Sequence, residues 1–393
     1  MVAALQAAWR GAQVTLFERN PQVGRKLLVT GSGRCNITNG AAVAEKYACA
    51  DPRWMAILLE QFGVSDLLSM LDEIGVPVYK TADEWYYPLS NSAQSVVDAF
   101  ANALSLAGVS LQTPAQVTAI HSRPNGFLLR YRQGDEKKEA TYEKVIVAAG
   151  GAAYPTLGSR GELFAVLEDL GHKVSPKRPA LAPVLAELGP LNPLQGVRLD
   201  AGVSLWDGGQ RLAATTGNLI FTQWGLNGPA VMDLSHHISA RPGHKLSLSL
   251  NLLQTCQAAF DRLLDQKRSA PYPLKVLLGA FFPPKVAPIY LRMARLPENC
   301  LLSEVSQAEL ERLVEKLKDT RLPVNGVRGF EYCQVSAGGV PVGEVNPQTM
   351  ESRRVKDLYL TGETLDVVGP CGGYNLQYAF SSGAVAGRAA AAR

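Results

Sequence analysis

The chain has 393 residues, of which 47% are hydrophobic and 19% are charged, so it can form two or three domains with substantial cores. Its formal net charge of +4 is small for this length and its basic residues are not clustered, so we expect no nucleic-acid partner. Its apolar runs fall short of the roughly 18 residues of a membrane span, and its six cysteines show neither a C-x-x-C pair nor zinc spacing, which predicts no membrane association, no metal site and a reducing, cytoplasmic location.

The first two predicted elements are a helix and a short strand. Apolar residues recur at helical spacing over residues 2–10, and the strand pattern 14–18 ends in Glu18. In a Rossmann unit, an acid at the end of the second strand accepts hydrogen bonds from ribose hydroxyls, which makes Glu18 a candidate ribose ligand. The alternative is a surface acid that follows a buried strand.

A Rossmann unit normally places a glycine-rich phosphate loop before this helix and strand. No G-x-G-x-x-G pattern occurs anywhere in the chain. We therefore expect the sequence to start just after a first strand and its phosphate loop, with Met1 either an internal methionine of a longer frame or the start of a truncated chain.

The loop after Glu18 is basic and rich in glycine, serine, threonine and asparagine. Gly31 and Gly33 allow close approach of the backbone to a ligand, and Arg34 can pair with a phosphate in bidentate fashion. Asn36, Thr38 and Asn39 offer donors and acceptors suited to the edge of a heteroaromatic ring. The alternative is a polar surface loop without a ligand.

Helices and strands follow, and the last of these strands runs into a double glycine. Periodicity predicts helices at 52–74 and 93–106 and strands at 109–111, 117–121, 127–132 and 144–151. Open α/β sheets bind ligands at the carboxyl ends of their strands, so Gly150 and Gly151 are candidate ligand contacts. The alternative is a tight turn that binds nothing.

A change in composition marks an inserted domain. Residues 176–335 are rich in proline, with short strand patterns first and a more helical part at about 255–321. A strand and helix pattern typical of a Rossmann domain resumes after the insert, so residues 1–175 and 336–393 are expected to form one domain that is split in sequence. Residues 335–345 are predicted to be a hairpin that links the insert back to this domain.

The last candidate site lies near the C-terminus. A strand closes in Gly362 and Glu363, and Gly372 and Gly373 precede a helix that starts near Tyr374. A helix start carries partial positive charge and free amides, which favours an electron-rich group. The alternative is an ordinary glycine-rich helix start.

Catalytic side chains are not identified by the sequence. None of the five histidines lies in the motifs above, and the pair His236–His237 is either a substrate-side acid or base or a structural pair. Cys371 and Tyr374 are nearest to the motifs, and both can equally be packing residues.

Several motifs in one order resemble a known family, the bacterial HI0933-like flavoproteins, also described as NAD(P)/FAD-dependent oxidoreductases or aminoacetone oxidase-like proteins. The resemblance spans nearly the whole chain. The motifs are Val23-Gly-Arg-Lys-Leu-Leu, Gly31-Ser-Gly-Arg-Cys-Asn-Ile-Thr-Asn, Tyr87-Pro-Leu-Ser, Gly150-Gly-Ala-Ala-Tyr-Pro, Phe221-Thr-Gln-Trp-Gly-Leu-Asn-Gly-Pro-Ala, Ala337-Gly-Gly-Val, Gly362-Glu-Thr-Leu-Asp and Gly372-Gly-Tyr-Asn-Leu-Gln.

The resemblance implies an α/β fold in which an FAD-binding Rossmann-like domain, truncated at its N-terminus, carries an inserted β-rich domain and a small helical domain. It places Glu18 on the adenosine ribose, the basic loop along the pyrophosphate and flavin, and the backbone of Val117 on the adenine. The implied cofactor-binding residues are Glu18, Arg19, Arg25, Lys26, Gly33, Arg34, Cys35, Asn36, Thr38, Val117, Gly150, Gly151, Gly362, Glu363, Gly372, Gly373, Tyr374, Asn375 and Leu376.

The function that the resemblance implies is a flavin-dependent oxidoreductase. FAD is expected to pass a hydride from NAD(P)H to a small organic acceptor such as an enone. Two alternatives stay open: an FAD-binding protein that modifies or senses RNA, and an inactive truncated flavoprotein. The substrate and the oligomeric state do not follow from the sequence.

Overall fold

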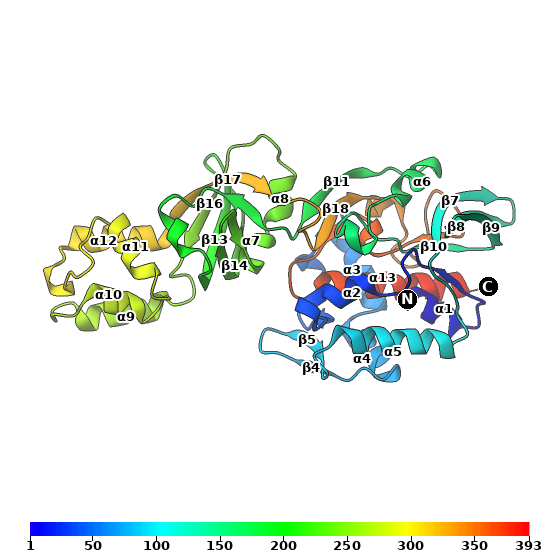
Figure 1. The fold of residues 1–393 in the computed structure, drawn as a ribbon, viewed down its shortest axis with the longest axis horizontal. Helices are drawn as coiled ribbons and strands as arrows, with labels where there is room; N and C mark the ends of the chain where they lie inside the picture. Colours follow the sequence, from blue (N-terminus) through cyan, green and yellow to red (C-terminus); the bar gives the residue numbers. More distant parts are fainter. Residues whose placement is uncertain (393) are drawn as a thin grey trace. The chain divides into compact units, whose positions relative to one another are not determined.

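The computed structural model describes residues 1–392, which divide into two compact units (Figure 1). Unit 1 comprises Met1–Arg178 and Gln334–Arg393, and unit 2 comprises Pro179–Cys333. The sequence analysis placed the insert at residues 176–335. Each unit has its own buried hydrophobic core, so each is described by itself.

Unit 1 combines short strands with helices that pack around them. Its helices are α1 (Val2–Ala8), α2 (Arg25–Val29), α3 (Pro52–Gln61), α4 (Val64–Glu73), α5 (Ala93–Leu106), α6 (Leu163–Asp169) and α13 (Tyr374–Ala391). Its strands are β1 (Thr15–Phe17), β2 (Thr38–Asn39), β3 (Ala48–Cys49), β4 (Val78–Lys80), β5 (Trp85–Pro88), β6 (Ser110–Gln112), β7 (Gln116–Arg123), β8 (Gly126–Gln133), β9 (Glu136–Tyr142), β10 (Val145–Val147), β11 (Ser175–Ala180), β18 (Val335–Gly339), β19 (Leu358–Leu360) and β20 (Val367–Val368).

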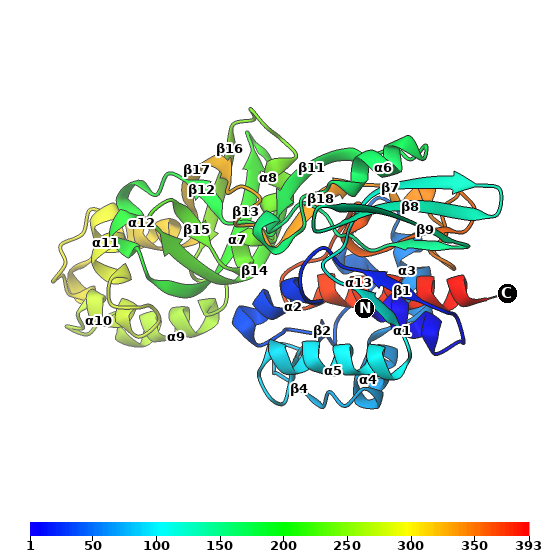
Figure 2. The same ribbon diagram turned by 45° about the vertical axis from the view of Figure 1, so that its right-hand side comes forward.

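Two parallel strand pairs form the centre of unit 1. Strand β1 pairs with β6, and β10 pairs with β19, so the chain leaves after β10 for the insert and returns to its side at β19. Helix α13 contacts both α1 and β19, and Figure 2 shows it beside α1. Within residues 1–392 no strand joins the two pairs.

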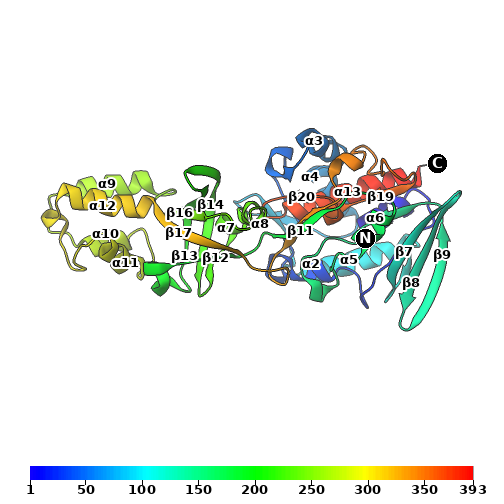
Figure 3. The same ribbon diagram turned by 90° about the horizontal axis from the view of Figure 1, so that it is seen from above.

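A three-stranded antiparallel sheet, β7-β8-β9, lies at one edge of unit 1 (Figure 3). Phe17 of β1 meets Tyr131 of β8 edge-on, with ring centroids 4.9 Å apart, and also meets Tyr142 of β9. These aromatic contacts anchor the sheet beside the end of β1, immediately before Glu18.

Residues 52–74 form two helices and not the one that periodicity predicts. Helix α3 ends at Gln61, and Gly63 is the N-cap of α4, with its amide bonded to the Asp66 carboxylate at 2.8 Å. The stretch Pro52–Glu73 is long and apolar enough to cross a membrane by length and composition alone. Its largest apolar side chains, among them Trp54, lie in the core of unit 1, which accounts for that hydropathy.

The predicted hairpin at residues 335–345 is wrong. Strand β18 pairs with β11, and a single 3-10 turn at Val342–Glu344 follows it. Pro341 has no amide to donate to a returning strand. The partner of β18 therefore comes from residues 175–180, at the other end of the insert.

Unit 2 is a closed barrel with small helices. The strands follow the order β12-β15-β14-β13-β16-β17, and alternate residues of β13 from Leu199 to Leu205 point into the core. Helices α9 to α12 lie together beyond one end of the barrel strands (Figure 3). The elements are β12 (Val184–Ala186), β13 (Arg198–Asp207), β14 (Gln210–Thr222), β15 (Gly225–Asn227), β16 (Leu246–Asn251), β17 (Thr320–Val327), α7 (Pro229–Met232), α8 (Ser235–Ser239), α9 (Gln257–Lys267), α10 (Leu274–Gly279), α11 (Val286–Met293) and α12 (Gln307–Lys318).

Candidate functional site

Glu18 is held in a fixed orientation at the end of β1. Its backbone amide bonds to Gln112, and its carbonyl accepts from Ala115 at 2.7 Å, just before β7. Its Oε1 accepts from both the backbone and side-chain nitrogens of Asn20, at 2.8 and 2.7 Å. No described residue donates a hydrogen bond to Oε2, so this oxygen can accept one from a hydroxyl group of a ligand. Val117 lies two residues beyond Ala115, which brings it to the same corner.

Asn20 joins this corner to the loop after β10, and the sequence analysis did not identify it. Its Oδ1 accepts from Arg25, and its Nδ2 donates to the carbonyl of Leu157. Arg19 reaches the same loop through Glu162, at 2.6 Å. The sequence around Asn20 contains no motif that marks it as a site residue. Its role depends on a contact with Leu157, more than a hundred positions away.

The carboxyl end of β10 carries a second cluster. Glu363 Oε2 pairs with Lys26 at 2.9 Å, and Oε1 accepts from the amide and hydroxyl of Ser336. The Ser336 hydroxyl in turn accepts from the amide of Ala152 at 2.9 Å. A Cβ at Gly151 would lie 2.1 Å from Ser336 Oγ and 2.5 Å from the Glu363 carboxylate, so only glycine permits this approach.

The Ser336→Ala variant tests this cluster. Removing the hydroxyl leaves the buried Ala152 amide without its acceptor, which costs about 1–3 kcal/mol of unfolding free energy. We expect a lower melting temperature together with weaker flavin retention. Ser239→Ala, which removes a longer serine–backbone contact of 3.3 Å in unit 2, is the control and should change neither. If Ser336→Ala kept the wild-type melting temperature and flavin content, the Ser336 hydroxyl would contribute neither to stability nor to flavin binding.

The loop 31–39 contains an unusual run of left-handed backbone. Gly31, Ser32, Gly33 and Cys35 all have positive φ, with Ser32 at 59° and Cys35 at 62°. Each non-glycine residue in this region costs on the order of 1–2 kcal/mol, and such strain concentrates at ligand sites.

Side chains of this loop divide into exposed and buried groups. Arg34 is exposed and stacks on Tyr87, with Cζ 4.8 Å from the ring centroid. Asn36 is 8% exposed, and its Oδ1 is buried without a hydrogen-bond partner among the described residues. Cys35 is fully buried, and burial raises the pKa of its thiol to about 11, with the hydrogen bond to Thr30 opposing. Cys35 is therefore a neutral packing group at pH 7.

The loop before α13 packs against the end of this segment. Asn39 Nδ2 donates to the carbonyl of Gly372 at 3.0 Å, and Thr38 donates to the buried Gln377 amide oxygen at 2.5 Å. Tyr47, which the sequence analysis did not identify, donates to the carbonyl of Tyr374 at 3.0 Å. The two motifs, more than 330 residues apart, thus form one backbone cradle.

The start of α13 is free of side-chain caps. Gly373 occupies the N-cap position with φ of 95°. The side chain of Asn375 bonds to the amide and carbonyl of Gly369, so it stabilises the preceding turn. Leu376 packs against the core of unit 1. The start of this 18-residue helix carries partial positive charge, which favours an electron-rich group.

The remaining glycine positions shape the strand ends. Gly150 and Gly362 both have positive φ, at 76° and 59°. The Gly362 amide donates to Ser382 of α13 at 2.9 Å, so the turn that presents Glu363 is tied to the helix.

These features fit FAD. The Glu18 carboxylate suits a ribose, and the Arg25 guanidinium suits a pyrophosphate. The buried, unpartnered oxygen of Asn36 suits the edge of a ring, and the start of α13, which has no side-chain cap, suits an electron-rich ring. All the predicted cofactor residues belong to unit 1. Their roles towards the cofactor remain predictions.

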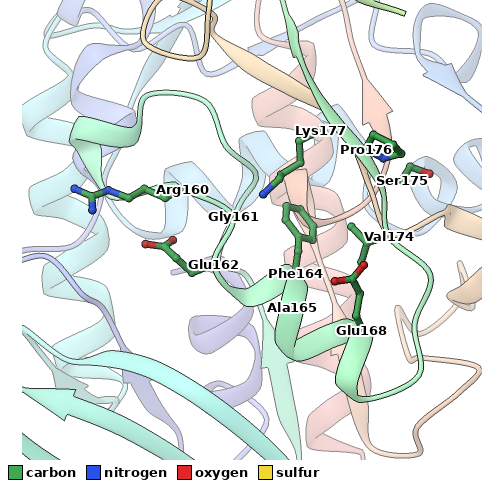
Figure 4. Close-up of a pocket in the computed structure, with 10 residues that line it drawn as sticks. All are labelled: Arg160, Gly161, Glu162, Phe164, Ala165, Glu168, Val174, Ser175, Pro176 and Lys177. Carbon is green, nitrogen blue, oxygen red and sulfur yellow. The ribbon is translucent and has the colours of Figure 1, made fainter.

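A separate hollow of about 450 Å³ lies beside the start of α6 (Figure 4). Two basic side chains, Arg160 and Lys177, and two acidic ones, Glu162 and Glu168, surround Phe164 there. Lys177 lies over the Phe164 ring, 5.6 Å from its centroid. Glu162 of this hollow is the carboxylate that pairs with Arg19.

The chain matches the family model described as HI0933-like protein Rossmann domain over residues 1–389. It is 37% identical over 403 aligned positions to the 3-dehydro-bile acid delta(4,6)-reductase of Clostridium scindens, covering 100% of this chain and 97% of that protein. It is 29% identical to the ribosomal RNA dihydrouridine synthase of Escherichia coli, covering 97% and 93%.

Among solved structures, the fold is similar to the 3-ketosteroid-delta4-(5alpha)-dehydrogenase of Rhodococcus jostii, with a TM-score of 0.52 and 15% identity over 100% of this chain and 94% of that one. At that identity the likeness concerns the fold alone. The family resemblance and the α/β class with a Rossmann-like domain, both predicted from the sequence, are confirmed.

Proposed function

Since this chain belongs to the HI0933-like protein Rossmann domain family, we propose that it is an FAD-dependent oxidoreductase that reduces a carbon–carbon double bond conjugated to a carbonyl group in a small organic acceptor. The observation that carries this proposal is full-length similarity, at 37% identity, to a protein named as a bile acid delta(4,6)-reductase. NAD(P)H is the proposed electron donor.

Unit 1 supplies the groups that this proposal needs. Glu18, oriented by Asn20, holds the ribose, and Arg25, which pairs with no carboxylate among the described residues, neutralises the pyrophosphate. The amides at the start of α13 stabilise negative charge on the electron-rich ring. FAD, when bound, supplies the hydride chemistry, and the protein supplies orientation, charge stabilisation and exclusion of water.

A second candidate acceptor is a pyrimidine base in RNA. Two relatives, at 29% and 26% identity over 97% of this chain, are named ribosomal RNA dihydrouridine synthases. The chemistry is shared, because a dihydropyrimidine also arises by saturating a double bond next to a carbonyl. The formal charge of only +4 gives weak electrostatic attraction for a polyanion, so the small acceptor is preferred.

The test follows the flavin spectrum without oxygen. We expect the purified protein to show flavin absorption, to lose it on addition of NADPH or NADH, and to regain it on addition of a 3-oxo-Δ4 steroid. The saturated 3-oxo steroid is the matched control and should leave the flavin reduced. Reoxidation by a uridine-containing ribosomal RNA fragment but not by the steroid would select the second candidate. Absence of flavin absorption even after added FAD would overturn both.

A further inference from the structure

The loop 31–39 of unit 1 holds a buried oxygen atom that the protein itself does not satisfy. The Asn36 side chain is more than nine-tenths buried, and its Oδ1 accepts no hydrogen bond from any described residue. A buried acceptor in this state lowers the stability of the folded chain, and native proteins keep few of them. A ligand that brings its own donor group to this oxygen would remove that cost on binding.

Other buried polar atoms of unit 1 that lack a partner among the described residues differ from this oxygen in chemistry. They are the hydroxyls of Thr364 and Tyr378 and the Nε of Arg178. A hydroxyl rotates and can both donate and accept, and a guanidinium nitrogen only donates. The carboxamide oxygen of Asn36 can only accept, so it selects an N–H or O–H group of a ligand.

The backbone around Asn36 is fixed on both sides. The amide of Ile37 donates to the carbonyl of Tyr86 at 2.8 Å, and Cys35 has φ of 62°. A Cβ at Gly31 would lie 2.9 Å from the Asn36 amide nitrogen, so the loop closes tightly on this residue. The side chain is therefore held in place before a ligand arrives and loses little freedom on binding.

The oxygen belongs to the face of this segment that meets α13. Ile37 is fully buried in the hydrophobic core of unit 1, and alternate side chains of an extended segment share a face, so Asn36 lies on the face of Thr38. Thr38 donates to Gln377 of α13. A Cβ at Gly373, the N-cap of α13, would lie 2.5 Å from the Thr38 carbonyl. Asn36 therefore lies on the face that packs against the start of this helix.

FAD offers a donor that fits this place. The pyrimidine edge of its oxidised ring carries an N–H group, N3–H, between the carbonyls C2=O and C4=O. The start of α13 favours such an electron-rich carbonyl, which places an acceptor on the same face close to the donor beside it. The adenine amine is the other N–H donor of FAD, and it belongs to the ribose end, where the predicted ligand Glu18 lies at the end of β1.

We propose that the side-chain oxygen of Asn36 accepts a hydrogen bond from N3–H of the flavin ring, and that the same oxygen destabilises the protein when flavin is absent. This inference rests on the proposed FAD cofactor and names the group of the flavin that the loop 31–39 recognises. Asn36 thus has opposite effects on two properties, because it lowers the stability of the flavin-free protein and raises the affinity for flavin. A residue that only packs changes both in the same direction.

The experiment titrates the deflavinated full-length protein with FAD and with N3-methyl-FAD, and follows flavin fluorescence. We expect the wild type to bind FAD roughly tenfold or more tightly than the methylated flavin, because methylation removes the donor. Asn36→Ala removes the acceptor and leaves room for the methyl group, so it should bind the two flavins within about threefold of each other. Asn36→Leu keeps the side-chain size and should bind FAD roughly tenfold more weakly than the wild type. Its flavin-free melting temperature should be equal to or above that of the wild type.

Tyr378→Phe is the matched control, since it removes another buried polar atom without a partner among the described residues and leaves the loop 31–39 unchanged. It should keep the wild-type preference for FAD over N3-methyl-FAD. A preference that survives in folded Asn36→Ala would overturn the inference. A flavin-free melting temperature that falls in Asn36→Leu would overturn it too, because the oxygen would then stabilise the protein by itself.

Two further outcomes separate this inference from its neighbours. If Asn36→Leu weakened FAD binding while the wild type did not discriminate against N3-methyl-FAD, the oxygen would belong to a hydroxyl group of the cofactor and not to N3–H. Reduction of a 3-oxo-Δ4 steroid tests the proposed function independently. A protein that discriminates between the two flavins but does not reduce the steroid or a uridine-containing RNA would keep this inference and overturn the proposed function.

Discussion

Replacing Gly373 with alanine is expected to yield protein that is purified without flavin. Gly373 has φ of 95°, and an added Cβ would lie 2.5 Å from both the carbonyl carbon and oxygen of Thr38. The backbone conformation costs about 1–2 kcal/mol for an L side chain, and overlap with backbone that cannot rotate away costs about 1–3 kcal/mol more. Both costs act on the cradle formed by the loop before α13 and the segment at Thr38, so FAD affinity should fall by roughly a hundredfold or more.

The measurement is the ratio of flavin to protein absorbance after gel filtration, with circular dichroism to establish that the variant is folded. Gly134→Ala is the matched control. Gly134 also has positive φ, at 61°, but its Cβ would meet nothing within 4 Å. It should therefore carry only the conformational cost and retain flavin. A wild-type flavin ratio in folded Gly373→Ala would show that the cofactor does not depend on this cradle.

The cradle illustrates what the sequence could and could not predict. The glycine pair before α13 and the polar loop 31–39 were each identifiable, because glycines and donors concentrate locally in both motifs. Their contact through Asn39 and Gly372 was not, since it joins residues 333 positions apart. Tyr47 was missed for the same reason, because its hydroxyl bonds to a backbone carbonyl and leaves no motif of its own.

Secondary structure shows the same division between local and long-range causes. The helix at residues 93–106 was predicted with the observed bounds of α5, because Val96, Phe100 and Leu104 repeat at helical spacing. The break at Gly63 also had a local signal, an aspartate three residues later, which the apolar periodicity outweighed. The pairing of β18 with β11 had none, because a strand's partner is set by tertiary packing.

Replacing Glu344 with alanine is expected to lower the free energy of unfolding by about 3 kcal/mol at pH 7, because it removes a buried carboxylate that accepts several hydrogen bonds and pairs with the half-exposed Arg354. Glu344 accepts from the fully buried His172 at 2.7 Å, from the Lys173 amide at 3.1 Å and from Arg354 at 2.8 Å. The other ring nitrogen of His172 contacts Ser352 at 2.9 Å. Without the carboxylate, the buried Nδ1 of His172 loses its partner and the Lys173 amide loses its acceptor.

The pH dependence of this loss has a definite sign. Burial raises the pKa of Glu344, but the hydrogen bonds from Arg354, His172 and the Lys173 amide outweigh it, so the pKa lies below its ordinary value of 4.5. A carboxyl whose pKa is lower in the folded state stabilises the protein above the unfolded value and loses that contribution as pH falls through the folded value. The difference between wild type and Glu344→Ala should therefore be full above about pH 5 and shrink below pH 4.5.

Urea unfolding at several pH values measures both effects. Glu139→Ala, which removes the exposed partner of Arg130, is the control and should change stability by less than about 1 kcal/mol at every pH. Glu344→Gln keeps the shape of the side chain and loses the charge, so its deficit should be smaller than that of alanine. A deficit for Glu344→Ala that stayed constant between pH 7 and pH 4 would assign the loss to packing and not to the ionised carboxylate.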